Sequence, residues 1–369
     1  MFKRTLIAAS LTVAALASAQ AMAANVTGGG ATLPAALYKG SANSILPANF
    51  SYLGTGSGVG KVAFLTNDST QFKTTGTVHF AGSDSVLSAT EIGNYNTAYS
   101  TTYGPLIQLP SVATSVAIPY KKTGQTALNL TSAQLCDVFS GTATKWGDLL
   151  NNSDATPIRV VYRSTSSGTS EILTRHLNAV CPTKFAVTTT FANTLKPAGT
   201  PLPTTFVGVV NTSDVAAAVN AVDGSIGYVG PDGVNANSNA VVSRVNGVQP
   251  TTANVTTALS SATLPVNPAD PAQWAPVVAN PATGYPIAAY TNFIFGQCYK
   301  DASVAADVKA FLTTHYSVPG NTVATVAHGF SVVPTNWKNA VTANFITNST
   351  GNNLDINNAS VCNTVGRPL

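Results

Sequence analysis

Charged residues are scarce in this sequence. Asp, Glu, Lys and Arg together make up 9% of the 369 residues, and the formal net charge is +4. The basic residues do not gather into runs, so the sequence does not indicate a nucleic-acid-binding protein. Ser, Thr, Asn and Ala take the place of charge, which predicts a polar, weakly charged surface.

Glutamate and histidine are also rare. The chain has two glutamates, Glu91 and Glu171, and four histidines that are scattered without metal-ligand spacing. The carboxylate pair of a glycosidase would have to come from aspartates, and a catalytic triad would have few bases to choose from. This scarcity disfavours enzymes that depend on acid–base catalysis.

Only four cysteines are present, and they form no CxxC motif or Cys/His cluster. We therefore expect no metal site and no cofactor. Four cysteines can pair in three ways, and an oxidising compartment favours disulfides over free thiols. We expect chain neighbours to pair, which gives Cys136–Cys181 and Cys298–Cys362.

Long apolar runs are missing except at the start. There Lys3 and Arg4 precede "LIAASLTVAALASA", and small residues follow at Ala21 and Ala23. This pattern predicts a secretory signal peptide, residues 1–23, cleaved after Ala23. No later segment has about 18 uninterrupted apolar residues, so we expect a mature chain that is periplasmic or secreted and not inserted in a membrane.

What remains alternates short β-branched runs with longer amphipathic ones. The strand-like runs are "TVHFAGSD", "IRVVYR" and "YPIAAYTNFIF", and the helix-like runs are "TSAQLCDVFSG", "TSEILTRHLNAV" and "ADVKAFLTTHY". This alternation predicts an α/β fold. The mature length suggests two domains at about 150 residues each. Residues 232–283 are rich in Asn, Pro and Thr, which predicts long loops with one short helix near "TANVTTALSSA".

The stretch "VVYRSTSSGTSEIL" places one arginine and several hydroxyl side chains where a strand passes into a helix. Arg163 ends the strand, and Ser167, Gly168 and Thr169 stand at the first turn of the helix. The free amides and the dipole of a helix N-terminus attract anions, and an arginine can add a bidentate fork. The stretch therefore predicts an oxyanion site, with a simple N-cap in a polar loop as the alternative.

Two other loops have a similar character. In "GGGATLP", three glycines lead to Thr32 and Leu33 just before a predicted helix. In "GTGSGVGKVAFL", the spacing excludes a P-loop, because Thr55 stands where a glycine is required. It also excludes a nucleophile elbow around Ser57, which we interpret as an exposed donor. Asp84 then ends a buried strand, an unusual place for a lone carboxylate.

These elements, in this order, resemble the periplasmic phosphate-binding proteins of ABC transporters, and within them the DING-like subgroup. The resemblance covers the mature chain and extends to the segments listed here: "HFAGSDSVLSATE", "SVATSVAIPY", "QLCDVFSG", "FAVTTTF", "TNFIFGQCY" and "VCNTVGRPL". The subgroup's Asp-Ile-Asn-Gly reads Asn25-Val26-Thr27-Gly28 here. That difference leaves the three polar loops intact.

The resemblance implies a type II clamshell of two α/β lobes joined by two crossover strands. Lobe 1 would hold residues 24–115 and 284–369, and lobe 2 residues 116–283. The family's neighbour disulfides agree with the pairing above. By family analogy we also expect a monomer whose protein partner is an ABC transporter permease. The ligand positions of the family fall on eight residues: Thr32, Leu33, Ser57, Asp84, Arg163, Ser167, Gly168 and Thr169.

The implied ligand is inorganic phosphate. The carboxyl group of Asp84 allows this assignment to be tested on physical grounds. A carboxylate beside an anion is favourable only if the ligand brings a proton, which phosphate has at neutral pH and sulfate lacks. We hypothesise that Asp84 selects phosphate over sulfate. Two other functions stay open from the sequence: a secreted phosphatase of the same family, and an extracellular interaction or adhesion protein in which phosphate is incidental.

Overall fold

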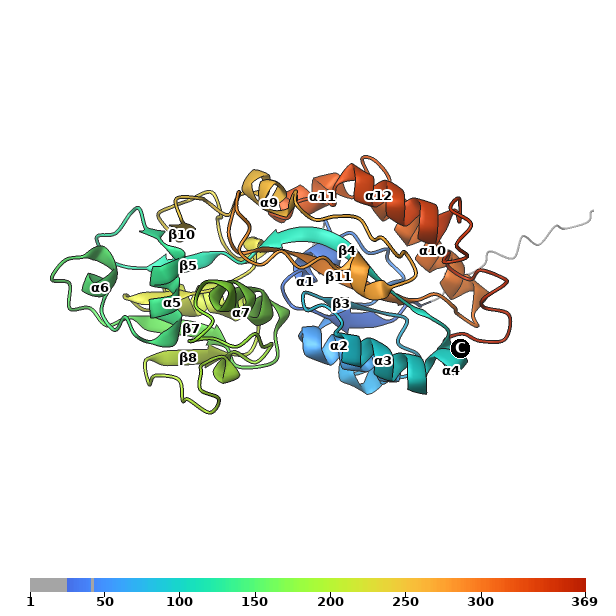
Figure 1. Cartoon of the computed structure of the whole chain (residues 1–369), viewed down its shortest axis with the longest axis horizontal. Coiled ribbons are helices and arrows are strands. Elements are labelled where there is room, and N and C mark those ends of the chain that lie inside the picture. The colour runs from blue at the N-terminus through green and yellow to red at the C-terminus, as the bar shows by residue number, and fades with distance from the viewer. Residues whose placement is uncertain (1–24, 41–42) are drawn as a thin grey trace, which may run out of the picture.

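The protein consists of two α/β lobes that lie side by side (Figure 1). The structure is a computed structural model, and it describes residues 25–40 and 43–369. The predicted signal peptide, residues 1–23, lies outside the described residues. Within the described part of the chain, no helix combines the length and the apolar character needed to cross a bilayer.

Lobe 1 is built on a five-stranded sheet in the described residues, with the order β2-β1-β3-β11-β4. The first three strands are parallel, and β11 runs antiparallel to both β3 and β4. In sequence order the strands are β1 (Gly28–Gly30), β2 (Leu53–Gly54), β3 (Phe80–Ser83), β4 (Leu106–Ser115) and β11 (Ala288–Gly296). Every residue of β4 is buried, as expected for a strand covered on both faces.

Lobe 2 is built on a six-stranded sheet, again within the described residues, with the order β6-β10-β5-β9-β7-β8. Strands β9, β7 and β8 are parallel, whereas β5 runs antiparallel to β9 and β10. The strands are β5 (Ile118–Lys121), β6 (Asn129–Leu130), β7 (Arg159–Arg163), β8 (Phe206–Val209), β9 (Ser225–Gly227) and β10 (Val242–Val245).

Helices cover both sheets. In lobe 1 they are α1 (Ala35–Tyr38), α2 (Ser57–Thr66), α3 (Ala89–Ala98), α4 (Ser100–Tyr103), α9 (Thr252–Leu259), α10 (Ala302–Tyr316), α11 (Thr322–Ala327) and α12 (Thr335–Val341). In lobe 2 they are α5 (Ser132–Ser140), α6 (Trp146–Leu150), α7 (Gly168–Val180) and α8 (Thr212–Asn220). The expected boundaries of α5 hold: the Thr131 side chain caps its N-terminus, and Gly141 ends it in the left-handed conformation.

Two adjacent crossovers connect the lobes. The chain leaves lobe 1 after Ser115 and enters β5 at Ile118. After the segment 252–274, which packs on lobe 1, the chain passes through the core of lobe 2 at Tyr285 and Ile287 and then enters β11. The two passages touch, because the amide of Val116 donates a hydrogen bond to the carbonyl of Ile287 at 2.9 Å. Neighbouring crossovers of this kind allow two rigid lobes to rotate about one hinge.

One segment differs from the sequence-based domain boundaries. Residues 252–274 were expected in lobe 2, but α9 packs on β4 and β11 of lobe 1, where Val255 and Leu259 join a core cluster with Tyr290. The 3₁₀ helix at Pro271–Trp274 also lies on β4, and Trp274 belongs to the main core of lobe 1. The apolar faces of two short helices decide this placement, which composition alone did not indicate.

Both disulfides lie within single lobes. Cys136 of α5 pairs with Cys181 at the end of α7 in lobe 2, and Cys298 pairs with Cys362 in lobe 1. This is the neighbour pairing expected from the sequence. Such bonds are typical of proteins that fold in an oxidising compartment.

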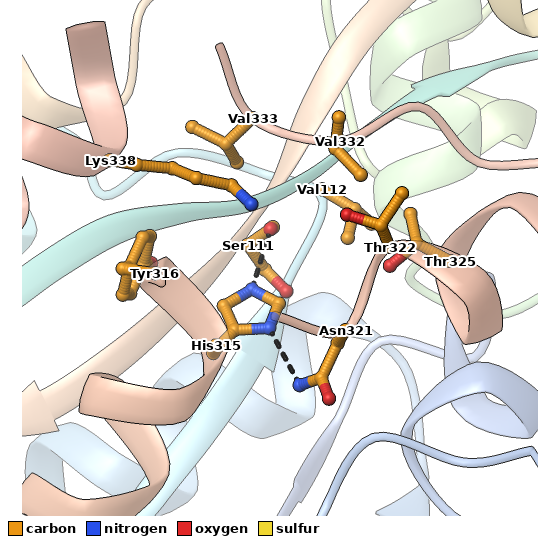
Figure 2. Close-up of a pocket in the computed structure, with 10 residues that line it drawn as sticks. All are labelled: Ser111, Val112, His315, Tyr316, Asn321, Thr322, Thr325, Val332, Val333 and Lys338. Carbon is orange, nitrogen blue, oxygen red and sulfur yellow. Dashed lines mark hydrogen bonds between the residues drawn. The ribbon is translucent and has the colours of Figure 1, made fainter. Parts of the chain in front are cut away.

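Three histidines are buried in the lobes. Burial lowers the pKa of His79, His176 and His315 to about 4 in each case. Figure 2 shows His315, in the last turn of α10, directed at β4: its Nε2 lies 2.8 Å from the carbonyl of Ser111, and its Nδ1 lies 3.1 Å from the side-chain amide nitrogen of Asn321. These side chains fill the interior as neutral rings.

We predict that the stability of the ligand-free protein falls as the pH drops from about 6.5 to about 4. In that window the histidines are protonated in the unfolded chain but stay neutral in the folded protein, because their pKa is lowered there. Acid therefore favours unfolding. Asp84 opposes this, because burial raises its pKa to about 7. In this window three histidines bind protons only in the unfolded state and one carboxyl binds a proton only in the folded state, so the unfolded state binds two protons more. The unfolding free energy therefore falls by roughly 2–3 kcal/mol for each pH unit.

Urea unfolding in phosphate-free buffer between pH 7 and pH 4 measures this slope. His176 offers a matched variant, because neither of its ring nitrogens has a hydrogen-bond partner among the described residues. The variant His176→Phe should therefore halve the slope, and it removes only a weak polar contact with the carbonyl of Pro286. An unfolding free energy that stays level across the window would contradict the prediction.

Candidate functional site

Polar residues gather at the carboxyl ends of the strands, where the two lobes face each other. Asp84 directly follows β3, Thr32 lies two residues after β1, and Arg163 is the last residue of β7. Ser57 opens α2 shortly after β2, and Ser167 caps α7 shortly after β7. In open α/β sheets this edge is the usual place for ligands.

Arg163 lies at the centre of these contacts and is 1% exposed. Its Nη1 donates to the hydroxyl of Thr32 at 2.7 Å and to that of Ser167 at 3.2 Å. Its Nη2 donates to Thr165 at 3.0 Å. Hydroxyl groups orient the guanidinium without neutralising it, so its charge stays available to an anion.

Asp84 faces Arg163 from the other lobe. Its amide donates to the hydroxyl of Ser57 at 3.1 Å, and its carboxyl is 5% exposed. Burial raises the pKa of Asp84 to about 7, although the hydroxyls of Thr291 and Ser57 and the charge of Arg163 act in the opposite direction. Above this pKa the carboxyl is mostly ionised, and a buried carboxylate is an acceptor for a ligand that carries a proton.

Three buried polar atoms at this site have no hydrogen-bond partner among the described residues. They are Oδ1 of Asp84, Nε of Arg163 and Oγ1 of Thr169. Buried polar groups are almost always paired in folded proteins. One acceptor and two donors, from both lobes, therefore point to a polar ligand between them.

Glycines bring the lobes into direct contact. A β-carbon built on Gly168 of α7 would lie 2.4 Å from Oγ of Ser57 and 2.5 Å from Cβ of Asp84. One built on Gly56 would lie 2.5 Å from the carbonyl oxygen of Ser166. The glycine-rich loop in "GTGSGVGKVAFL" resembles a nucleotide-binding motif only in composition. Its Gly56 lets the two lobes approach closely.

The eight residues expected to bind a ligand fall into this one region. Thr32 and Ser167 are joined through Arg163, and Ser57 is joined to Asp84. The remaining three predicted residues lie beside these five. Leu33 is buried against Gly230 of lobe 2, and Gly168 and Thr169 form the first turn of α7.

Sequence reasoning missed Thr212, the first residue of α8. Its buried hydroxyl lies 2.8 Å from that of Thr32 and accepts a hydrogen bond from Nη1 of Arg163 at 2.5 Å. It therefore links the two lobes beside the arginine. The signal that could have found this position is the "NTSD" stretch, an N-terminal helix pattern like the one after β7.

The comparisons with known proteins agree with this geometry. A family model described as a PBP superfamily domain matches residues 15–317. A phosphate-binding protein from Stenotrophomonas maltophilia has a solved structure with a TM-score of 0.87 and 46% identity, over 94% of this chain and 100% of that one. The chain belongs to the periplasmic phosphate-binding protein family.

Other members of this family show the range of names within it. A high-affinity periplasmic phosphate-binding protein of the DING type, solved with bound phosphate, has 43% identity and a TM-score of 0.87, over 94% of this chain and 100% of that one. Alkaline phosphatase L of Pseudomonas aeruginosa is 63% identical over the full length of both chains. The family thus contains members named as binders and members named as enzymes.

Proposed function

We propose that this protein binds inorganic phosphate in the cleft between its lobes. The observation that carries the proposal is that a buried carboxyl, Asp84 of lobe 1, and a buried guanidinium, Arg163 of lobe 2, each keep an unpartnered polar atom at the same site. The family supports phosphate as the ligand. The proposed contacts are the eight predicted residues: Thr32, Leu33, Ser57, Asp84, Arg163, Ser167, Gly168 and Thr169.

The chemistry of the cleft fits a protonated tetrahedral anion. Hydroxyls, helix amides and one guanidinium would donate to the phosphate oxygens, and Asp84 would accept the phosphate proton. A hydrogen bond to a charged group contributes about 1.5–3 kcal/mol. Several such bonds, less the cost of ordering the site, would give a dissociation constant at or below about 1 μM.

The wider biological role is part of the same proposal. Two disulfides and the family support export to the periplasm or beyond. Cleavage of the signal peptide after Ala23 is proposed from the sequence pattern alone. After export the chain would act as a monomer in phosphate uptake or scavenging. A transporter permease would be its protein partner in the uptake role.

Phosphatase activity is the second candidate, because the relative from Pseudomonas aeruginosa carries that name. An ester would need room for its alcohol portion beside the bound phosphoryl group. The close approach of Gly168 to Ser57 and Asp84 restricts that room when the lobes are shut. Binding of the free anion therefore fits the geometry better than hydrolysis of its esters.

Equilibrium dialysis against radiolabelled phosphate tests the proposal. The mature protein, stripped of ligand by unfolding and refolded, should retain one phosphate per chain at micromolar concentration. The same preparation should leave an aryl phosphate unchanged. Hydrolysis that disappears in an Arg163→Met variant would instead establish the phosphatase, and failure to retain any phosphate would overturn the proposed function.

A further inference from the structure

A second contact between the lobes lies next to the candidate site without belonging to it. Ser85, the residue after Asp84 in lobe 1, donates its hydroxyl to Oε2 of Glu171 in lobe 2 at 2.5 Å. Ser85 is 1% exposed and Glu171 is 7% exposed. Neither residue is among the eight proposed ligands, and Glu171 is one of only two glutamates in the chain.

A side chain of the same helix, that of Arg175, orients Glu171 for this bond. Its Oε1 accepts from Nε of Arg175, one turn further along α7, at 3.1 Å, and from the Nη2 of the same side chain. The arginine balances the charge and fixes the carboxylate, which leaves Oε2 directed at lobe 1. The acceptor of the contact is therefore paired with a guanidinium, oriented and shielded from water.

Ser85 is fixed from the other side. The Ser83 hydroxyl accepts from the amide of Ser85 at 3.2 Å and donates to its carbonyl at 2.5 Å. This tight turn at the end of β3 sets the direction of both Asp84 and Ser85. The same turn thus places one residue in the candidate site and the next one against lobe 2.

We propose that Ser85 and Glu171 form a latch that closes with the lobes and slows the release of the ligand. The inference rests on the proposed function, because it assumes that phosphate is bound in the closed form. A bond that exists only in the closed form adds its free energy to the affinity of any ligand that selects that form. Ser85 and Glu171 are positioning residues, since neither is among the eight proposed ligand contacts.

The latch is expected to act on dissociation. The ligand can leave only after the lobes separate, and separation must first break the bond between Ser85 and Glu171. Removing either partner should therefore raise the dissociation rate of phosphate about tenfold and leave the association rate within about twofold. The melting temperature of the ligand-free protein should change little, because the bond joins two lobes and not the interior of one.

A double-mutant cycle tests the latch. Ser85→Ala, Glu171→Gln and the double variant would be compared with the mature protein by calorimetry with phosphate and by stopped-flow dissociation. Each single variant should weaken binding about tenfold, and the double variant should be no weaker than the worse single one. Such coupling identifies one shared bond, which a general disturbance of the fold does not produce.

The other glutamate supplies the matched control. Glu91 forms an ion pair with Lys61 and caps α3, and both contacts lie inside lobe 1. Glu91→Gln should lower the melting temperature and leave phosphate binding within twofold of the parent. Ser100→Ala is the control for Ser85, because Ser100 of α4 is half-buried and its hydroxyl donates within lobe 1, to the carbonyl of Asn96.

The outcomes separate the latch from the proposed function. If the parent protein binds no phosphate, the proposed function fails and the latch fails with it. If the parent binds and both single variants release phosphate at the parental rate, the latch alone is overturned. Effects of Ser85→Ala and Glu171→Gln that simply add in the double variant would also overturn it, because no shared bond would then exist.

Discussion

Replacing Asp84 with asparagine is expected to lower the selectivity for phosphate over sulfate, the ratio of their two dissociation constants, by at least about 100-fold. At pH 7.5, above the pKa of about 7, Asp84 is mostly ionised, and sulfate would face a buried acceptor with no proton to offer it. Sites of this kind discriminate by up to about 10⁴-fold. Asparagine keeps the size of the side chain but presents an amide that can donate to sulfate. Phosphate would bind less tightly and sulfate more tightly than before.

Competition calorimetry with both anions at pH 7.5 measures this change. The exposed Asp137, which pairs with Lys184 on the surface of lobe 2, offers a matched control. Asp137→Asn should leave both affinities as they are. If sulfate is still rejected as strongly by Asp84→Asn, the selectivity comes from another feature of the cleft and the role given to Asp84 is wrong.

The second large effect is expected from Gly168→Ala, which should weaken phosphate binding by about 100-fold. The added methyl group would lie 2.4 Å from Oγ of Ser57 and 2.5 Å from Cβ of Asp84, both in the opposite lobe. A methyl group forced into a packed interior costs about 1–3 kcal/mol. Here the lobes can relieve it by staying apart, so the cost falls on closure and not on folding.

Two measurements separate closure from folding in this variant. Calorimetry should show the loss of affinity, while the melting temperature of the ligand-free protein stays near that of the parent. X-ray scattering should show compaction with phosphate in the parent and much less in Gly168→Ala. Gly93 of α3 is the control, because a β-carbon there meets nothing within 4 Å. A Gly168→Ala variant that still binds and compacts normally would contradict the closed contact.

The local features of the site could be predicted from the sequence because they depend on neighbouring residues. A strand that ends in Arg163 and a helix capped by Ser167 follow from a β-branched run, a hydroxyl-rich turn and an amphipathic run. The boundaries of α5, with Thr131 at one end and Gly141 at the other, follow from capping rules in the same way.

Features that depend on the approach of the two lobes could not be predicted. The glycines at 56 and 168 are understood only when Ser166 and Ser57 are found against them. Thr212 lies 180 residues from Thr32 in the sequence, and Glu171 lies 86 residues from Ser85. No local pattern relates such pairs, and the burial that raises the pKa of Asp84 is likewise a property of the folded molecule.

The hydroxyl groups around Arg163 explain how so few charges can hold an anion. Thr32, Thr165, Ser167 and Thr212 all accept hydrogen bonds from the guanidinium, and each keeps it in place without cancelling its charge. A carboxylate partner would hold the arginine more tightly but would compete with the ligand. The scarcity of charge noted in the sequence thus extends into the cleft, where dipoles do much of the binding.

Calorimetry of the stripped mature protein with phosphate and sulfate at pH 7.5 tests the central claim most directly. That claim is that Asp84 and Arg163 enclose a proton-bearing tetrahedral anion between the lobes. We predict one site per chain, a dissociation constant for phosphate at or below about 1 μM, and sulfate binding about 10⁴-fold weaker. Titration of phosphate without heat, or sulfate bound as tightly as phosphate, would contradict the account.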